Sequence, residues 1–566
     1  MKTFRNIMKM SALALLSLAM LAGCNTKQSK MKQELTDFIR KHDSVVIPLS
    51  KEANLAYWNA AISGTPEDWK KAENLQLEMV KVFSNKESLA KLEEIKVSGL
   101  ISDTLLSRQL DVLYRQYLTA KADTAKLNEA VRMGTEIEQK YGNFRAEVKG
   151  KKLSDNDIEE ILRNSKNTGE QQEAWIAQKK IGTVVADDIK KLVLLRNEIA
   201  KEVGFDNYHE MSLTLGEEDP KEISKLFDEL DSLTKEAFAG VKNEIDDYFV
   251  KYYNLKSKDE LRPWNYQNRF FQEAPKIYEV NLDQYYQGKN LETLTTEYYA
   301  GIGLPIEAML KNSDLYEKEG KNQHAFSIDI DQLGDVRVLC NIKSNSYWMN
   351  TMLHEFGHAV YDANIDKTLP FVLREPPQTF TTEAIAMLFG RMSSNPQWLK
   401  DVAGIPEEEK VKIADYCYKT LRLEQLVFSR WAQVMYRFEK SLYENPEQDL
   451  NKLWWDLVER YQLLKRPEGR NEPDWATKIH IATSPCYYHN YLLGELLASQ
   501  LHYYMVTNIL KSEDFRMQSY AGNKEIGAYL NEKVFMPGAK YYWNDMIEKA
   551  TGEKLTAKYY AKQFVD

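Results

Sequence analysis

The sequence predicts a mainly α-helical protein that contains one short β-hairpin. Over most of the chain, apolar residues recur three and four positions apart between charged residues, and few Gly or Pro interrupt them. The clearest stretches of this kind are residues 69–95, 104–141 and 186–203. Each helix of this pattern has one apolar face to bury, so we expect packed helices to form the core.

Only one region alternates apolar and polar residues as a strand does. Residues 325–330 and 336–340 flank a turn at residues 333–335, which predicts an antiparallel hairpin. The polar residues 149–155 are expected to form a loop. The predicted hairpin directly precedes the helix that carries the clearest motif of the sequence.

The composition is that of a globular protein, with 566 residues, 43% hydrophobic and 28% charged. At about 150 residues per domain the length allows three or four domains, but one large domain of two lobes fits as well, and no repeat or linker divides the chain. The net charge of -9 offers no basic surface for phosphates, so nucleic acid is not an expected partner. Beyond the N-terminal segment only Cys340, Cys417 and Cys486 remain, so at most one disulfide is expected.

The N-terminal segment resembles a bacterial lipoprotein signal. Basic residues precede the apolar residues 11–22, which are too few to span a bilayer of about 30 Å. Residues 21–24 read Leu-Ala-Gly-Cys, which resembles a lipobox, where the cysteine takes the lipid. We expect residues 1–23 to be removed and Cys24 to anchor residues 24–566 to a bacterial envelope membrane, on its periplasmic face or at the cell surface. The alternative is an ordinary secretory signal with an accidental cysteine.

His354-Glu355-Phe356-Gly357-His358 has the form H-E-x-x-H within a helical run at residues 347–362. Four residues turn an α-helix by about 400°, so His354 and His358 point from one face and can share a tetrahedral Zn²⁺. Glu355 lies beside the metal and can accept a proton from a water molecule there. The alternative is a chance pentapeptide on a surface helix, which the scarcity of His, 8 in the whole chain, disfavours.

A catalytic zinc ion takes a third protein ligand and leaves one position open. Glu383 is the candidate, because it lies one turn into a predicted helix, residues 379–390, that follows Pro376 and Pro377. A lone glutamate on a helix is more often a solvated surface residue. Residues 384–389 are apolar, however, and a buried carboxylate needs a partner such as the metal.

Together with further motifs, these residues resemble the angiotensin-converting enzyme family of zinc peptidyl-dipeptidases. The similarity is clearest over about residues 262–501, and before them residues 56–59 and 195–197 match best. The other matching segments, in chain order, are residues 353–358, 369–370, 373–375, 380, 383–384, 454–455, 457, 461–462, 470–472, 478–480 and 488–491.

The resemblance implies a two-lobed helical gluzincin metallopeptidase with a deep central cleft and the hairpin near the zinc site. It implies that zinc is bound by His354, His358 and Glu383. Glu355 corresponds to the general base of the family.

Six further residues match family residues that contact the substrate. His480 and Tyr491 correspond to the pair that donates hydrogen bonds to the developing oxyanion and the adjacent carbonyl. The residues that correspond to the ligands of the substrate's free carboxylate are Gln272, Lys478 and Tyr488. His324 corresponds to a residue that contacts the substrate backbone. Without the resemblance, the two tyrosines read as a core stripe and His324 as a structural residue.

The chain departs from the family pattern at five places. Met387 stands where the family has an Asp that steadies a zinc histidine. Gln323 replaces a cysteine whose family partner corresponds to Cys340, so that disulfide is absent. Asn490 and Val458 replace two Arg of a buried anion site, so we expect little activation by chloride. One extra residue lies between His480 and Tyr488.

The expected function is zinc-dependent hydrolysis of peptide bonds near a free C terminus, releasing dipeptides. Two alternatives stay open. An oligopeptidase of the thimet type shares H-E-x-x-H and a helical cleft, but the carboxylate-binding residues favour the dipeptidase. A lipoprotein that binds peptides with little catalysis is favoured by Met387 and opposed by the complete metal-binding set. Peptides are the expected partners, and the sequence does not define their side chains or the oligomeric state.

Overall fold

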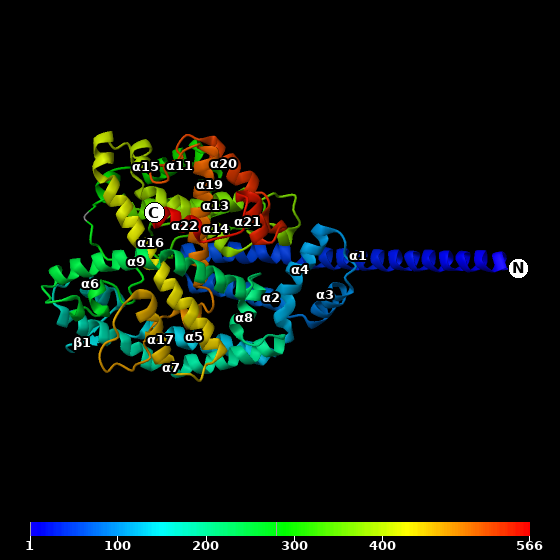
Figure 1. Cartoon of the computed structure of the whole chain (residues 1–566), viewed down its shortest axis with the longest axis horizontal. Helices are drawn as coiled ribbons and strands as arrows, with labels where there is room; N and C mark the ends of the chain where they lie inside the picture. Colours follow the sequence, from blue (N-terminus) through cyan, green and yellow to red (C-terminus); the bar gives the residue numbers. More distant parts are fainter. Residues whose placement is uncertain (1, 279, 566) are drawn as a thin grey trace.

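The computed structural model describes residues 2–278 and 280–565, with side chains from residue 27 onward. Over these ranges the chain is mainly helical, with two short antiparallel hairpins (Figure 1). The predicted mainly α fold with a hairpin near the candidate site is therefore confirmed.

The α-helices fall into two runs, before and after the second hairpin. The first run comprises α1 (Lys2–Ser63), α2 (Pro66–Phe83), α3 (Lys86–Ser98), α4 (Thr104–Leu118), α5 (Thr124–Asn143), α6 (Asp155–Asn164), α7 (Thr168–Val203), α8 (Tyr208–Leu215), α9 (Pro220–Tyr252), α10 (Asp283–Tyr286), α11 (Leu291–Gly301) and α12 (Glu307–Leu310). The second comprises α13 (Ser346–Ala363), α14 (Thr379–Gly390), α15 (Pro396–Asp401), α16 (Glu407–Glu444), α17 (Leu450–Leu457), α18 (His480–Thr483), α19 (His489–Tyr504), α20 (Lys524–Leu530), α21 (Trp543–Thr551) and α22 (Lys558–Phe564).

Short 3₁₀ and π turns connect or extend these helices. They are η1 (Thr119–Lys121), η2 (Lys258–Glu260), η3 (Pro263–Tyr266), η4 (Phe371–Leu373), η5 (Arg391–Ser394), η6 (Val458–Gln462), η7 (Asp474–Thr477), η8 (Met505–Ile509), η9 (Asn531–Phe535) and η10 (Gly538–Lys540).

Two predicted helical stretches are each divided by a capping residue. The stretch 69–95 breaks after α2, because Asn85 accepts a hydrogen bond from the Ser88 backbone N–H at 2.8 Å and starts α3. The stretch 104–141 breaks after α4, because Asp123 caps α5 in the same way. Apolar periodicity continues across both breaks, so it did not reveal them.

The predicted hairpin is confirmed as β3 (Phe326–Asp329) paired with β4 (Val336–Leu339). The interpretation of residues 149–155 as a loop was wrong, because β1 (Ala146–Val148) pairs with β2 (Lys151–Leu153). Lys149 and Gly150, with φ of 51° and 76°, form the two-residue turn between them. Turns with two positive φ angles match the twist of paired strands, which makes so short a hairpin possible.

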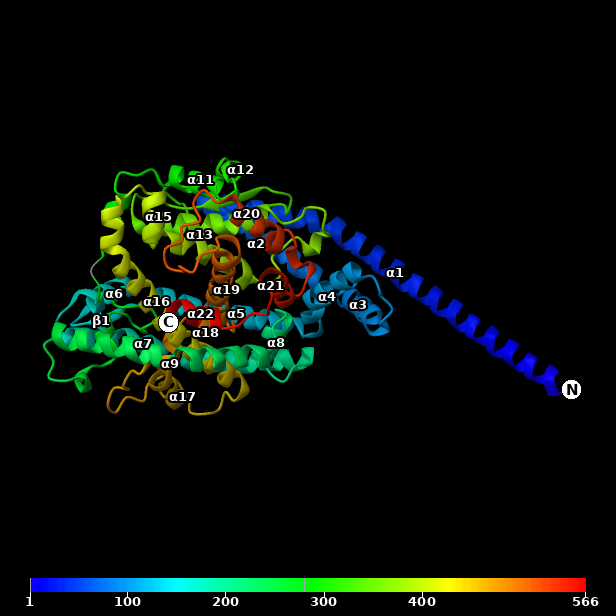
Figure 2. The same cartoon turned by 45° about the horizontal axis from the view of Figure 1, so that its top comes forward.

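The helices lie in two groups (Figures 1 and 2). α11, α13, α15 and α20 lie on one side and α6, α7 and α17 on the other. The long helix α16 links the groups, since it packs against α15 at one end and against α7, α9 and α17 further along. One continuous set of buried apolar residues reaches from Met31 to Phe564, so both groups share a core.

The start of α1 extends beyond the rest of the molecule (Figures 1 and 2). The predicted lipid-bearing Cys24 lies outside the residues whose side chains are described. Among the helices of the described residues, none combines the length and the apolar character needed to cross a bilayer.

Candidate metal centre

The candidate site depends on the close packing of α13 against α14. A Cβ atom on Gly357 would lie 2.8 Å from the Cα atom of Ala386, closer than a side chain can approach. The missing side chain at Gly357, inside H-E-x-x-H, therefore lets the two helices touch along their backbones. This contact places Glu383 of α14 over the two histidines of α13.

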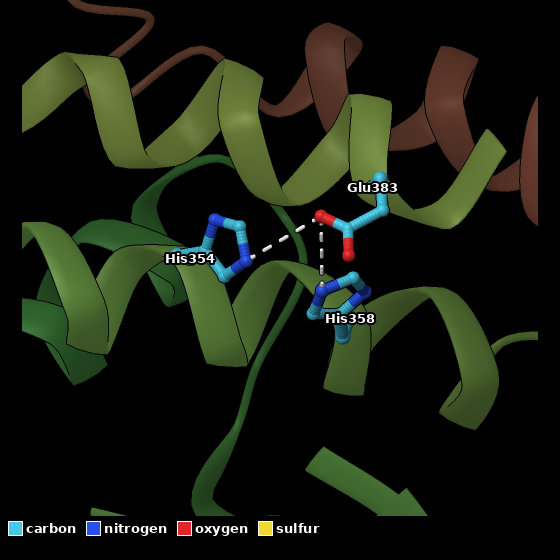
Figure 3. Close-up of side chains that lie close together, drawn as sticks. All are labelled: His354, His358 and Glu383. Atoms are coloured by element: carbon cyan, nitrogen blue, oxygen red, sulfur yellow. Dashed lines mark ion pairs between the residues drawn. The ribbon is translucent and has the colours of Figure 1, made fainter. Parts of the chain in front are cut away.

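His354, His358 and Glu383 form the only cluster among the described residues in which three candidate metal ligands converge. Their ligand atoms lie within 4.8 Å of one another. Glu383 Oε2 is 3.6 Å from His354 Nε2 and 3.7 Å from His358 Nε2 (Figure 3). The helical spacing thus brings together the three residues that the sequence predicted.

The electrostatics of these groups fit a bound cation. Burial lowers the pKa of His354 to about 4, and burial together with His354 lowers the pKa of His358 well below its usual value. Both imidazoles are therefore neutral and have a lone pair to donate. Burial also raises the pKa of Glu383 to about 7, because no nearby positive charge of the described residues stabilises its ionised carboxylate. Two neutral imidazoles and one carboxylate suit zinc and leave a fourth position free.

The second ring nitrogen of His358 has a partner that the sequence analysis missed. Because Nε2 faces Glu383, Nδ1–H donates to Thr382 Oγ1 at 2.8 Å. Met387, which replaces the family Asp, instead packs on α19, where a Cβ on Gly494 would lie 3.3 Å from Met387 Sδ. A neutral hydroxyl from the preceding turn of α14 thus orients the histidine.

Glu355 lies between the three candidate metal ligands, called the metal cluster below, and the β3–β4 hairpin. β3 and β4 pack on α13, and the backbone N–H of Ser327 in β3 donates to the Glu355 carboxylate. Burial, followed by the charge of Glu383, raises the pKa of Glu355 to about 8. A carboxylate with this affinity for a proton is suited to acid–base work near neutral pH.

Lys478, Gln272 and Tyr488 meet although they are far apart in sequence. Lys478 Nζ donates to Gln272 Oε1 at 2.6 Å and lies 5.3 Å from the centre of the Tyr488 ring. Lys478 makes no ion pair with a carboxylate of the described residues. Burial, and then the charge of Arg269, lower its pKa to about 8. This arrangement leaves a buried ammonium group in need of an anion.

His480 and Tyr491 both pack against Tyr488, and Tyr491 also lies near Glu383. The Tyr488 ring is 5.3 Å from the rings of both His480 and Tyr491. Burial and the charge of Glu383 raise the pKa of Tyr491, so its hydroxyl stays protonated and can donate. Nδ1 of His480 has no hydrogen-bond partner among the described residues, and burial followed by Lys478 lowers its pKa to about 4.

A tight turn precedes the two tyrosines. Cys486 adopts a left-handed φ of 55°, and its backbone N–H donates to Glu439 Oε1 at 2.9 Å. After this turn, Tyr487 also faces the metal cluster, since the charge of Glu383 contributes to its raised pKa after burial. Tyr487 was not predicted, because nothing in its local sequence separates it from Tyr488.

A buried carboxylate joins the helices of the site to the opposite group. Glu218, from the turn between α8 and α9, accepts a hydrogen bond from His489 Nε2 at 2.5 Å and another from Gln378 Nε2 at 3.1 Å. His489 starts α19 and Gln378 caps α14. The side chains of Glu218 and His489 are each only 2% exposed. No local motif marks this network, which was also missed.

His324 is the one predicted site residue that the structure leaves apart. It lies just before β3 with an exposed side chain, and within the described chain no hydrogen bond or ring contact joins its imidazole to the other site residues. Its role stays a prediction. Cys340 is a free, buried thiol, as are Cys417 and Cys486. The buried Lys321 holds the hairpin by donating to the Cys340 carbonyl oxygen and pairing with Asp314.

A helical fold with two histidines one turn apart and a glutamate from an adjacent helix defines a gluzincin type of metal site. The sequence model of the family described as "Angiotensin-converting enzyme", peptidase family M2, matches residues 29–263 and 264–564. The chain therefore belongs to this peptidase family.

Individual relatives are distant. "Thermostable carboxypeptidase 1" of Pyrococcus furiosus is 24% identical over 262 residues, 42% of this chain and 51% of that protein. "Angiotensin-converting enzyme" of Mus musculus is 21% identical over 424 residues, 70% of this chain and 32% of that protein. "Inactive angiotensin-converting enzyme-related protein" of Caenorhabditis elegans is 21% identical over 371 residues, 58% of this chain and 40% of that protein. The chain thus spans about a third to a half of the length of these relatives.

The Thr382 hydroxyl gives the first testable prediction. Replacing Thr382 with Val removes the acceptor of His358 Nδ1–H and should weaken zinc binding roughly tenfold, because a lost outer partner of a metal ligand costs 10- to 100-fold. Thr382→Ser keeps the hydroxyl and should bind zinc as the wild type does. Competition with a chelator measures both affinities, and equal affinity of the Val variant and the wild type would show that Thr382 does not orient the ligand.

Proposed function

We propose that the protein is a zinc-dependent peptidase that cleaves near the free C terminus of peptides and releases dipeptides. The observation that carries this proposal is the buried, ion-pair-free Lys478 beside Gln272 and Tyr488, one tyrosine away from the metal cluster. A cation, an amide and a phenol are suited to hold a carboxylate. These three residues, called the clamp below, favour binding of the C-terminal end of a peptide over binding of an internal segment.

The residues divide the reaction between them. Zinc bound by His354, His358 and Glu383 would polarise the peptide carbonyl and make a water molecule more acidic. Glu355 takes the proton of the attacking water and passes it to the leaving amine. His480 and Tyr491 donate hydrogen bonds to the oxygen that becomes negative. The neutral imidazole of His480 keeps one N–H, and the phenol of Tyr491 keeps its O–H, so both can donate.

The clamp residues position the substrate for this step. Lys478, Gln272 and Tyr488 bind the terminal carboxylate, which fixes the distance from the end of the peptide to the cleaved bond. His324, on the segment before β3, is proposed to contact the peptide backbone. Mass spectrometry of a peptide mixture incubated with the zinc-loaded protein tests the whole proposal. Dipeptides are expected, whereas single residues, internal fragments or no cleavage would contradict it.

Glu355 and Glu383 separate catalysis from metal binding. Glu355→Gln should keep zinc but lose several orders of magnitude in turnover, because an amide cannot take the proton. Glu383→Ala should lose zinc, because only two ligands remain. Metal analysis and turnover of both variants check this, and wild-type zinc content in Glu383→Ala would remove Glu383 from the ligand set.

The pKa of Lys478 predicts a dependence on pH. Below its pKa of about 8 Lys478 is charged and binds the carboxylate, and as the pH rises through 8 the charge is lost. The kcat/KM for a free-acid peptide, divided by that for its C-terminal amide, should therefore fall above pH 8 by at most roughly tenfold per pH unit, because the ratio cancels the ionisation of Glu355. The C-terminally amidated peptide should be cleaved at least about tenfold more slowly below this pH. Equal rates on both peptides would favour an oligopeptidase.

Chloride activation is expected to be small. Val458 and Asn490 supply no charge for a buried anion, and Trp455 already donates its indole N–H to Asp474 at 3.1 Å. Arg470 donates two further hydrogen bonds to Asp474, at 2.6 and 2.5 Å, and Asp474 is 1% exposed. The Asp474 carboxylate thus already accepts the hydrogen bonds of Trp455 and Arg470, which leaves these donors unavailable to an anion. Turnover should stay constant as chloride replaces acetate at fixed ionic strength, and a large saturable rise would contradict this.

We also propose that Cys24 carries a lipid that anchors the protein to a bacterial envelope membrane. The support is the sequence Leu-Ala-Gly-Cys at residues 21–24 after a short apolar segment. In a bacterial host fed labelled palmitate, the full-length protein should take up label and Cys24→Ala should not. Equal labelling, or none in either protein, would contradict the anchor.

A further inference from the structure

A cavity of about 680 Å³ opens beside the carboxylate-binding residues. Its wall includes Gln272 and the segment that follows it, the start of α13 at Ser346 and Tyr347, and one face of α16 that includes Phe428. This volume accommodates a long side chain together with water. The cavity is therefore a place where part of a bound peptide can be recognised.

Two carboxylates of the wall adjoin the clamp. Glu273 directly follows Gln272 in the chain. Glu424 lies one helical turn before Phe428 in α16, and the Phe428 ring packs 6.3 Å from the Tyr488 ring. Glu273 is thus next to Gln272, one of the three carboxylate-binding residues. Glu424 is one helical turn from Phe428, which contacts another of them, Tyr488.

The two basic residues of the wall, Arg163 and Lys276, lie near acidic residues other than Glu424. Arg163 pairs with Glu273 at 3.4 Å, but both side chains are exposed, so this pair is weak. Lys276 lies near Asp283, whose pKa is lowered by hydrogen bonds from Ser346 and by the charge of Lys276.

Glu424 is left without a partner. No hydrogen bond or ion pair to it occurs among the described residues, although its side chain is accessible within the cavity. Glu424 is exposed to solvent on the cavity wall, where partial desolvation and then the like charge of Glu273 raise its pKa. A carboxylate in this state gains from a cation that enters the cavity.

We propose that this cavity receives the side chain of the last residue of the peptide, and that Glu424, assisted by Glu273, selects a cationic side chain, Lys or Arg. The proposal rests on the proposed function, because Lys478, Gln272 and Tyr488 must hold the terminal carboxylate. A side chain beside that carboxylate then extends toward the unpaired Glu424 and forms a charge-assisted hydrogen bond.

The test uses two peptides that differ only in the last residue: Lys or its uncharged isostere norleucine. The wild type should cleave the Lys peptide with a kcat/KM about tenfold above that of the norleucine peptide, the effect of one charge-assisted hydrogen bond. Glu424→Gln should reduce this ratio to about one. Glu408→Gln, the same change on an exposed residue at the start of α16, should preserve it.

The possible failures are distinguishable. A wild type that cleaves both peptides equally well, or a ratio that survives in Glu424→Gln, would overturn the inference while the proposed peptidase stands. If no peptide is cleaved, the proposed function fails, and calorimetric binding of the same peptides to Glu355→Gln tests the cavity alone. Equal Kd values for the Lys and norleucine peptides in that measurement would overturn the selection of a cation. Circular dichroism confirms that each variant is folded.

Discussion

The contact between α13 and α14 at Gly357 and Ala386 is the constraint on which the site depends. Because no side chain separates the two backbones, Glu383 comes within 3.7 Å of both histidines. A second close approach, at Gly494, brings α19, the helix that carries Tyr491, against the same α14. The metal cluster and the residues that face it are thus set by helix packing rather than by loops, which suits a site that must hold its geometry.

Around this helix contact, other side chains of the chain make polar contacts in regions where the chain departs from the family pattern. Thr382 orients a ligand histidine, and Asp474 supplies a negative charge beside Trp455. Lys321 fastens the hairpin near Cys340. Each replacement keeps a buried polar group satisfied within the chain. The loss of family residues therefore does not by itself indicate a loss of function.

The part of the site that could be predicted from sequence is the part that depends on local periodicity. Two histidines four residues apart share a helix face whatever surrounds them, and α14 has the bounds that were predicted for it. The Glu218 network and the Thr382 contact could not be predicted, because they depend on how distant helices meet. The β1–β2 hairpin was missed because only three residues pair on each side of its turn.

The two halves of the site differ in how much of the fold they need. The metal ligands come from two neighbouring helices, whereas Gln272 and Lys478 are 206 residues apart and meet only because α16 and the segments around it pack correctly. Lys478 lies 5.5 Å from the centre of the Trp431 ring of α16, and Phe428 of the same helix supports Tyr488. Any loosening of α16 should therefore disturb Lys478, Gln272 and Tyr488 before it disturbs the candidate metal ligands. The convergence of Lys478, Gln272 and Tyr488, more than that of the candidate metal ligands, therefore depends on the packing of both groups of helices.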